Sequence, residues 1–284
     1  MISKIESLLL NGGTAHKNEK IAIILSKSFY LFLILKIAFL WPVINNIIAN
    51  NSLQLGPGIR YVIFAPLALV KINLLLFIIP FIGILILGIT IKPNYFFAVA
   101  IFWFSISLSK LITEIANGSD LILNIFLFIS IFLSITPKIT LRNGSQLQQL
   151  IFNSALLLGQ VQMALIYLLS GYDKLLSAAW RNGEAMHSIF NLTFFQNPFI
   201  KLNFSETECV ILCWMVIIFE ISFAVLIWIK KFRITLLVMG VFFHLGIIVF
   251  LGLADFGMVM IICYTVFLPV KNSSARDLTV AVVN

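Results

Sequence analysis

Long apolar runs separated by short polar linkers dominate this chain. Most of the runs reach about 18 residues, the length that crosses a hydrocarbon core of about 30 Å as an α-helix. They lie at about 21–43, 68–90, 95–112, 121–136, 150–172, 208–229, 234–251 and 255–270. None alternates apolar and polar residues as the strands of a membrane β-barrel do. The sequence therefore predicts an all-α fold, a polytopic transmembrane bundle of about eight helices.

The second of these spans is the least regular. Pro66, Lys71 and Pro80 interrupt it, and proline kinks or breaks a helix because it lacks a backbone N–H. Two interpretations stay open, a span that begins late and a span that is partly re-entrant.

Composition supports lipid as the main solvent of the folded chain. Apolar residues make up 61% of the 284 positions and charged residues only 11%, against roughly 25% charged residues in soluble domains. The net charge of +8 comes from basic residues scattered singly in linkers, which indicates membrane topology and not a nucleic-acid partner. We therefore expect a multi-pass protein of the cell membrane, with the lipid bilayer as its first partner.

Linker charge predicts the orientation, because Lys and Arg are retained on the cytoplasmic side. Alternate linkers and both ends are the more basic, with Lys4, Lys17, Lys20, Lys92, Lys138, Arg142, Lys230, Lys231, Arg233, Lys271 and Arg276. This assigns residues 1–20 and 271–284 to a cytoplasmic N-terminal segment and a cytoplasmic C-terminal tail, around a transmembrane domain at 21–270. Residues 173–207 then lie outside the cytoplasm. The first twenty residues lack a signal-peptide pattern, so we expect the first span to remain as an anchor.

Polar residues on the fifth span form a stripe. Their spacings of 4, 7, 7, 4 and 3 keep them on one helical face at about 100° per residue. The stripe consists of Gln149, Asn153, Gln160, Tyr167, Gly171 and Lys174. Such a face is not expected to contact lipid. It suits either hydrogen bonds between helices or the wall of a cavity that ends at Lys174.

Three ionisable residues near or inside the spans are candidates for chemistry. Lys174 either extends its ammonium into the headgroup region or acts as a base, a role that the adjacent Asp173 opposes. Glu220 and His244 fall in the middle of the sixth and seventh spans, where an ionisable group needs a partner. They are candidates for a contact with each other, either as a structural pair or with His244 as a proton donor or acceptor. Asp255 is expected in a tight turn.

Several standard motifs are missing from the sequence. It has no HExxH, no cysteine pairs at zinc spacing, no phosphate-binding glycine loop and no GxSxG turn. Cys209, Cys213 and Cys263 fall inside spans, where a thiol behaves as a small apolar residue. We therefore expect no metal site, and the sequence identifies no cofactor.

Two segments carry a family resemblance. The segment Gln160–Met186, QVQMALIYLLSGYDKLLSAAWRNGEAM, resembles a hallmark in which a helix ends in Y-x-x-S/A-G-x-x-K-L and is followed by W-x-x-G. The stretch Phe219–Pro269 resembles a second hallmark, an acidic residue in mid-helix, a basic turn, F-H and a last helix ending in F-x-P. Both are typical of the HTTM superfamily, and the resemblance covers about residues 95–270.

The resemblance implies both a site and a role. The superfamily includes the membrane part of vitamin K-dependent γ-glutamyl carboxylases and the sporulation-delaying protein B group, whose W-x-N-G turn is like Trp180, Asn182 and Gly183 here. Lys174 stands where the carboxylases place a catalytic base, and His244 occupies the histidine of their F-H motif. The candidate substrate-cavity residues are Gln160 and Tyr167 of the polar stripe, Trp180 of the W-x-N-G turn, and Glu220. Relatives of the second group act with a small companion protein in maturing or exporting a secreted toxin peptide.

Two departures separate this chain from the carboxylases. It reads Asp173-Lys174 where those enzymes have two basic residues, and it ends at residue 284 without their large soluble domain.

Three functions follow from these patterns and stay open. The first is a factor, enzymatic or not, in the maturation or export of a secreted antimicrobial-type peptide, with an extracytoplasmic cavity around Lys174 and His244. The second is a transporter of a small molecule or peptide that uses Lys36, Glu220 and His244 as part of a path. The third is a non-catalytic membrane scaffold or immunity factor.

Overall fold

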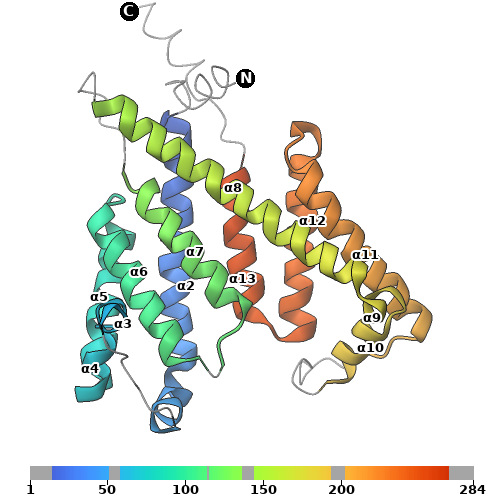
Figure 1. The fold of residues 1–284 in the computed structure, drawn as a ribbon, viewed down its shortest axis with the longest axis horizontal. Coiled ribbons are helices and arrows are strands. Elements are labelled where there is room, and N and C mark those ends of the chain that lie inside the picture. The colour runs from blue at the N-terminus through green and yellow to red at the C-terminus, as the bar shows by residue number, and fades with distance from the viewer. Residues whose placement is uncertain (1–14, 51–57, 114, 136–143, 193–201, 269–284) are drawn as a thin grey trace, which may run out of the picture. The chain divides into compact units, whose positions relative to one another are not determined.

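The computed structural model describes residues 15–50, 58–113, 115–135, 144–192 and 202–268. This part of the chain is helical and contains no strand, which confirms the predicted all-α class. Figure 1 labels its helices. Long elements are α2 (Ala15–Asn50), α5 (Leu74–Thr90), α6 (Tyr95–Leu111), α7 (Gly118–Leu133), α8 (Gly144–Leu176), α11 (Glu206–Leu226) and α12 (Lys230–Leu251). Shorter ones are α3 (Ile59–Ile63), α4 (Leu67–Ile72), α9 (Ala178–Arg181), α10 (Glu184–Asn191), α13 (Ala254–Cys263) and η3 (Tyr264–Phe267).

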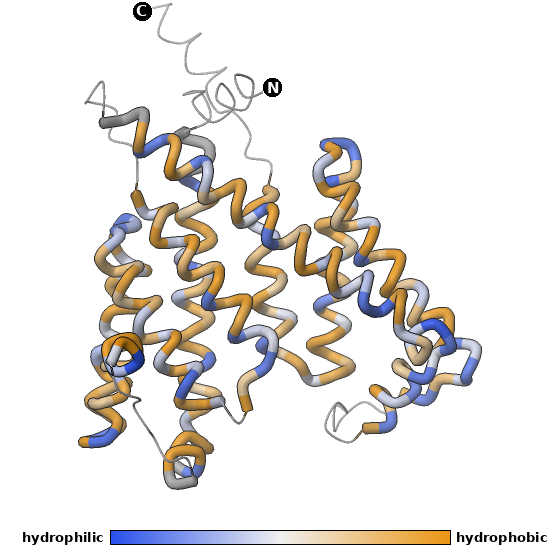
Figure 2. Tube along the Cα trace, in the orientation of Figure 1, coloured by the Kyte–Doolittle hydropathy of each residue, from blue (hydrophilic) through white to orange (hydrophobic). Residues whose placement is uncertain are grey.

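Eight apolar helices in the described residues match the eight predicted spans. Four are long and apolar enough to cross a membrane, namely Glu19–Ile44, Leu147–Leu176, Glu206–Leu226 and Lys230–Leu251. Four shorter apolar helices are Leu74–Thr90, Tyr95–Leu111, Gly118–Leu133 and Ala254–Phe267. Figure 2 shows the hydrophobic residues that run along these helices. The fold is that of a membrane-type helix bundle.

The second predicted span begins late. Pro66 precedes the short helix α4, and Asn73 then adopts an extended conformation with φ −161° and ψ 133°. The Asn73 side chain accepts a hydrogen bond from Leu75 N at 2.8 Å and so caps α5. Pro80 lies inside α5. The apolar helix therefore starts at Leu74, six residues after the predicted start at 68.

The chain divides into two compact units. The first contains Met1–Glu114, Asn124–Leu157 and Thr265–Asn284. Phenylalanine rings fill its core, with Phe81 and Phe104 stacked at 5.2 Å between centroids and Phe29 next to Phe126 at 6.2 Å. Ser105 donates to Asn124 Oδ1 at 2.7 Å, and Asn124 Nδ2 donates to Ser109 at 2.8 Å. These three polar side chains thus satisfy one another, as an apolar solvent requires.

The second unit contains Ile115–Leu123 and Leu158–Tyr264, and these ranges include Gln160, Tyr167, Lys174, Trp180, Glu220 and His244. A tight turn joins α12 to α13, because Gly252 ends α12 in the left-handed conformation with φ 67°. Asp255 was expected in the turn itself, but it lies just after the turn, in the first turn of α13. The carbonyl of His244 would lie 2.8 Å from a Cβ at Gly257, so glycine lets the two helices pack closely.

Two helices of the second unit were not predicted. The linker after α8 forms α9 and α10, separated by Gly183. Helix α10 is only eight residues long, and its apolar side packs on α11 through the buried residues Met186, Cys209 and Cys213. The apolar residues were too few for a span, so the sequence indicated only a linker.

Candidate functional site

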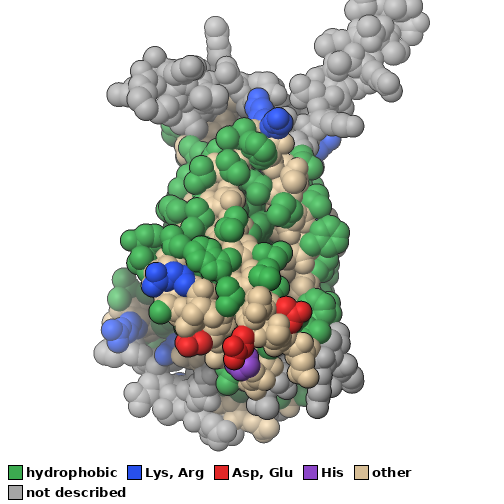
Figure 3. All heavy atoms as spheres, turned by 90° about the vertical axis from the view of Figure 1, so that its right-hand side faces the viewer, with side chains coloured by type: hydrophobic (Ala, Val, Ile, Leu, Met, Phe, Trp, Pro, Cys, Tyr) green, Lys and Arg blue, Asp and Glu red, His purple; other side chains and the backbone are tan. Residues whose placement is uncertain are grey.

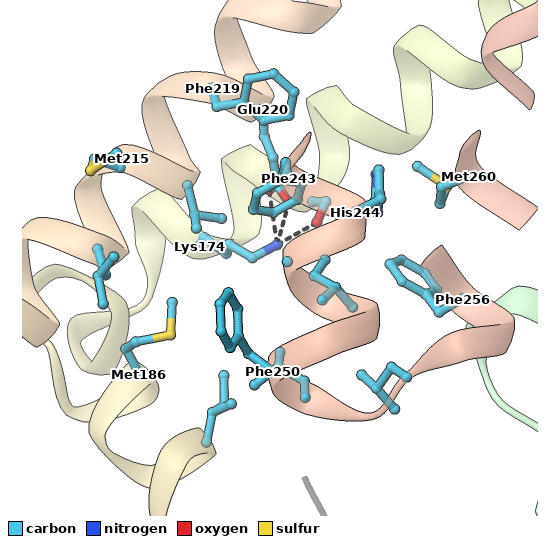
Figure 4. A pocket seen from close by; sticks show the side chains of 18 of the residues that line it. Lys174, Met186, Met215, Phe219, Glu220, Phe243, His244, Phe250, Phe256 and Met260 are labelled. Carbon is cyan, nitrogen blue, oxygen red and sulfur yellow. Dashed lines mark hydrogen bonds and ion pairs between the residues drawn. The ribbon is translucent and has the colours of Figure 1, made fainter. Parts of the chain in front are cut away.

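A cavity of about 740 Å³ lies within the second unit. Its size falls in the range of roughly 300–1,000 Å³ typical of small-molecule and cofactor sites. Side chains from α8 to α13 form its wall, and most of them are apolar, among them Phe219, Phe243, Phe250 and Phe256. Figure 4 shows these rings around the few polar groups. Polar chemistry in this cavity is therefore confined to a small number of residues.

An ion pair between α8 and α11 is the main polar feature of the wall. Lys174 Nζ donates to Glu220 Oε1 at 3.0 Å and to Oε2 at 2.8 Å, and it also donates to Ser170 Oγ (Figure 4). The three hydrogens of the ammonium thus have three acceptors. The Lys174 side chain is 17% exposed and that of Glu220 8%. Lys174 is paired inside the protein and does not simply extend toward the headgroups.

A glycine brings the two helices of this pair together. A Cβ at Gly171 would lie 2.9 Å from Ile221 Cγ1, 3.1 Å from Glu220 Cβ and 3.2 Å from Ile221 N. Backbone atoms cannot give way as a flexible side chain can. Because glycine has no side chain, α8 and α11 approach closely enough for Lys174 to reach Glu220.

The W-x-N-G turn holds an aromatic ring beside the ammonium. Lys174 Nζ lies 5.0 Å from the ring centroid of Trp180, within the range of a cation–π interaction. Gly183 adopts φ 90°, and a Cβ there would lie 2.8 Å from Val210 N. Trp214 Nε1 on α11 donates to the carbonyl of Arg181 at 3.2 Å. These contacts fix the turn against α11 and thereby place Trp180 at the cavity.

A second polar group of the wall is a chain of hydrogen bonds. His244 Nε2 lies 2.7 Å from the hydroxyl of Tyr167, which is also hydrogen-bonded to the hydroxyl of Tyr264. All three side chains are buried, and His244 is only 1% exposed. A Cβ at Gly240 would lie 2.5 Å from Tyr264 Cζ. Glycine at this position therefore leaves room for the Tyr264 ring.

Five of the six predicted site residues line this one cavity, namely Tyr167, Lys174, Trp180, Glu220 and His244. Gln160 is not part of the lining and lies two helical turns before Tyr167 on α8. The stripe of α8 is turned inward, since none of its six residues is exposed.

Glu220 and His244, which the sequence left as candidates for a contact with each other, have different partners. Glu220 bonds Lys174 and His244 bonds Tyr167. The sequence placed both residues in mid-span, but it did not show which faces of α11 and α12 they occupy. The partner of Lys174 is Glu220, and its exposed neighbour Asp173 does not form an ion pair with it.

The sequence did not indicate Ser170 or Tyr264 as residues of the site. Ser170 sits one turn before Lys174 on the same helix, so i to i+4 spacing was a usable signal. Tyr264 carries a hydroxyl inside an apolar run, which needs a partner when buried. Its partner lies 97 residues away, a separation that helical periodicity cannot reveal.

Lys36 and the three cysteines are not among the residues that line this cavity. Lys36 is 3% exposed on α2 of the first unit. Cys209, Cys213 and Cys263 are buried free thiols. Among residues that the structure describes, no group of three or more His, Cys, Asp or Glu side chains is arranged to hold a metal ion.

The fold and the cavity define the class of this molecule, an all-α protein of membrane type with a few polar groups inside an apolar pocket. Its chain is similar to "Sporulation-delaying protein SdpB" of Bacillus subtilis (strain 168), with 31% identity over 122 residues. The match covers 40% of this chain and 38% of that relative, so it spans well under half of the relative's length. No family model matches the chain, and no solved structure matches it.

Proposed function

We propose that this chain is a multi-pass protein of the cell membrane that takes part in the maturation or export of a secreted peptide, working through the cavity of its second unit. The similarity to a sporulation-delaying protein and the apolar helices support this role. The cavity would face the extracytoplasmic side, with residues 173–207 outside and both termini in the cytoplasm. A small companion membrane protein and the peptide precursor would be its partners.

One observation carries the proposal, the Lys174–Glu220 ion pair inside an apolar cavity. Charges are costly in such surroundings, and replacing a buried ion pair by apolar residues is often neutral or stabilising. Stability alone therefore gives little reason for a lysine and a glutamate in this wall. A role in binding or proton transfer gives a direct reason.

The pair offers a simple proton transfer. Moving one proton from Lys174 Nζ to a Glu220 oxygen converts an ammonium and a carboxylate into an amine and a carboxylic acid, without a change in net charge. The amine would then accept a proton from a bound molecule, and the surrounding phenylalanine rings would limit access of water. This base role agrees with the position that the HTTM resemblance assigns to Lys174, and residues 21–270 would form the HTTM-like domain.

The test is mass spectrometry of secreted peptides from native cells. Four strains are compared at equal membrane abundance of the protein, the wild type, a deletion, Lys174→Met and Lys71→Met. Lys71 is an exposed lysine on α4 of the first unit, so Lys71→Met controls for loss of a lysine. We expect a mature peptide to disappear from the deletion and from Lys174→Met, and to persist in Lys71→Met.

Other results separate the alternatives. A peptide that disappears only in the deletion would overturn the role of Lys174 and support a scaffold or immunity factor. A fully processed peptide that accumulates inside cells carrying Lys174→Met would assign the cavity to export. Flux through proteoliposomes that contain this protein alone would support a transporter.

A further inference from the structure

The tyrosine–histidine chain contains one buried polar atom without a partner. His244 Nδ1 is inaccessible and has no hydrogen bond, while Nε2 is bonded to Tyr167. The ring is 1% exposed and lines the cavity (Figure 4). Its other contacts are edge-on or tilted packing with Phe243, Phe256 and Tyr264. A buried polar atom without a hydrogen bond costs free energy, unless a bound ligand supplies the missing hydrogen-bond partner.

Counting hydrogens and acceptors favours one position for the proton of the His244 ring. The Tyr264 hydroxyl has one hydrogen-bond partner among the described residues, the hydroxyl of Tyr167. In one arrangement Tyr264 donates to Tyr167 and Tyr167 donates to His244 Nε2. Both hydroxyl hydrogens are then used. Because Nε2 accepts, a neutral ring must carry its proton on Nδ1.

The reverse arrangement leaves more groups unsatisfied. There Nε2 donates to Tyr167 and Tyr167 donates to Tyr264, so the Tyr264 hydrogen has no acceptor and the Nδ1 lone pair has no donor. Two buried groups are then unpaired, against one in the first arrangement. A doubly protonated ring has the same unpaired Tyr264 hydrogen, and it adds a buried cation that no carboxylate contacts. The first arrangement is therefore the favoured one.

We infer that Tyr264, through Tyr167, fixes the tautomer of His244 so that the ring presents an Nδ1–H donor to an acceptor oxygen of the cavity's ligand, once that ligand displaces the side chains that cover Nδ1. Tyr264 and Tyr167 are positioning residues, and a carbonyl on an otherwise apolar molecule is the matching ligand chemistry. This inference rests on the proposed function only in assuming that the cavity binds a ligand. It assigns His244 as a donor, which complements a base at Lys174 in the same wall.

Nuclear magnetic resonance of ¹⁵N-histidine in the purified protein tests the tautomer directly. The sequence has three histidines, so the His244 signals are assigned by their loss in His244→Asn. We expect a protonated Nδ1 and an unprotonated Nε2 in the wild type. Tyr264→Phe should give a mixture of the two tautomers, whereas Tyr30→Phe, at a buried tyrosine of the first unit, should leave the signals unchanged.

Two results would overturn the inference. One is a protonated Nε2 in the wild type. The other is an unchanged tautomer in both Tyr264→Phe and Tyr167→Phe. These spectra are recorded without any peptide, so they are independent of whether the protein acts in peptide maturation.

A ligand probe tests the acceptor. A long-chain alkyl methyl ketone should shift the Nδ1 signal, and an alkane of the same length should not. A ketone without effect would contradict a carbonyl-binding donor. A membrane lipid extract and the peptide fraction of the medium, added separately, then tell whether a small lipid-soluble molecule or a peptide carries the natural acceptor.

Substitutions at position 244 provide a second readout. The side-chain amide nitrogen of asparagine can occupy the place of Nδ1, whereas that of glutamine reaches toward Nε2. In the secreted-peptide assay we expect His244→Asn to retain several-fold more mature peptide than His244→Gln or His244→Ala. Equal loss in all three variants would argue against a donor at the Nδ1 position.

Discussion

At the scale of single residues, the ion pair between Lys174 and Glu220 sets the character of the site. Each charge is stabilised mainly by the other, because the other polar side chains of the cavity wall, Ser170, Tyr167, Trp180 and His244, carry no carboxylate or ammonium group. Removing one partner is therefore expected to destabilise the protein more than removing both. A single substitution leaves a charge that must be neutralised or stay unpaired.

We predict that Glu220→Gln lowers the free energy of unfolding by about 3 kcal/mol, the cost typical of breaking a buried pair. The double variant Lys174→Met/Glu220→Gln should recover most of this loss because no charge remains. Thermal unfolding in detergent measures both effects. Asp173→Asn is the matched control, since Asp173 is an exposed carboxylate next to Lys174 that does not pair with it. A double variant less stable than Glu220→Gln would contradict this account of the pair.

The sequence identified Lys174, Glu220 and His244 because ionisable residues are rare in apolar runs. It could not assign their partners. Whether Glu220 meets Lys174 or His244 depends on how α8, α11 and α12 are rotated about their axes, and Glu220 meets Lys174 because Gly171 permits a close approach. Tyr264 was missed because its role exists only through Tyr167, far away in the chain.

At the scale of helices, small residues control how closely the walls of the site pack. Gly171 and Gly240 both lie where an added Cβ would meet other atoms at 2.9 Å or less. Apolar side chains gain little from burial away from lipid, so close packing of this kind is a main source of helix association in membranes. The site therefore depends on these contacts as well as on its polar residues.

We predict that Gly171→Ala separates α8 from α11 and lowers stability by about 1–3 kcal/mol, the usual cost of overpacking. It should also reduce mature peptide in the secreted-peptide assay, because Lys174 and Glu220 move apart. Gly83→Ala on α5 is the control, since nothing lies within 4 Å of a Cβ at Gly83. That change should be neutral or slightly stabilising. Equal effects of the two substitutions would show that close packing at Gly171 is unimportant.

Apolar run length predicted every one of the eight apolar helices, but not every element. Helix α5 starts later than predicted, at Leu74, because the Asn73 side chain caps the helix there. The sequence pattern did not predict helices α9 and α10 because they are short. Helix α10 is stabilised by packing on Cys209 and Cys213 of α11. Tertiary contacts, rather than local pattern, create such elements.

At the scale of the whole molecule, surface chemistry bears on orientation. Figure 3 shows one face on which hydrophobic side chains cover a broad area, with the acidic side chains and the visible histidine below it and lysine or arginine side chains at both its upper and lower ends. The exposed acidic residues of the extracytoplasmic linker proposed here include Glu184 and Glu206. These acidic residues suit an extracytoplasmic linker, because basic linkers are the ones retained on the cytoplasmic side.

We predict that His187→Cys on α10 reacts with a membrane-impermeant maleimide in intact cells, and that Lys231→Cys on α12 reacts only after permeabilisation. Both positions are exposed. The native cysteines are buried, so the unmodified protein should give a low background of labelling. Labelling of Lys231→Cys in intact cells would reverse the proposed topology.

The central claim, that the cavity of the second unit handles the peptide, is tested most directly by photo-crosslinking. Benzoylphenylalanine replaces Phe250, which lines the cavity, or Phe39, which is 72% exposed on α2 of the first unit. The tagged precursor of the peptide lost in the deletion strain is supplied in native membranes. We predict a cross-link from position 250 and none from position 39. No cross-link from position 250, in a strain where maturation still depends on this protein, would contradict the claim.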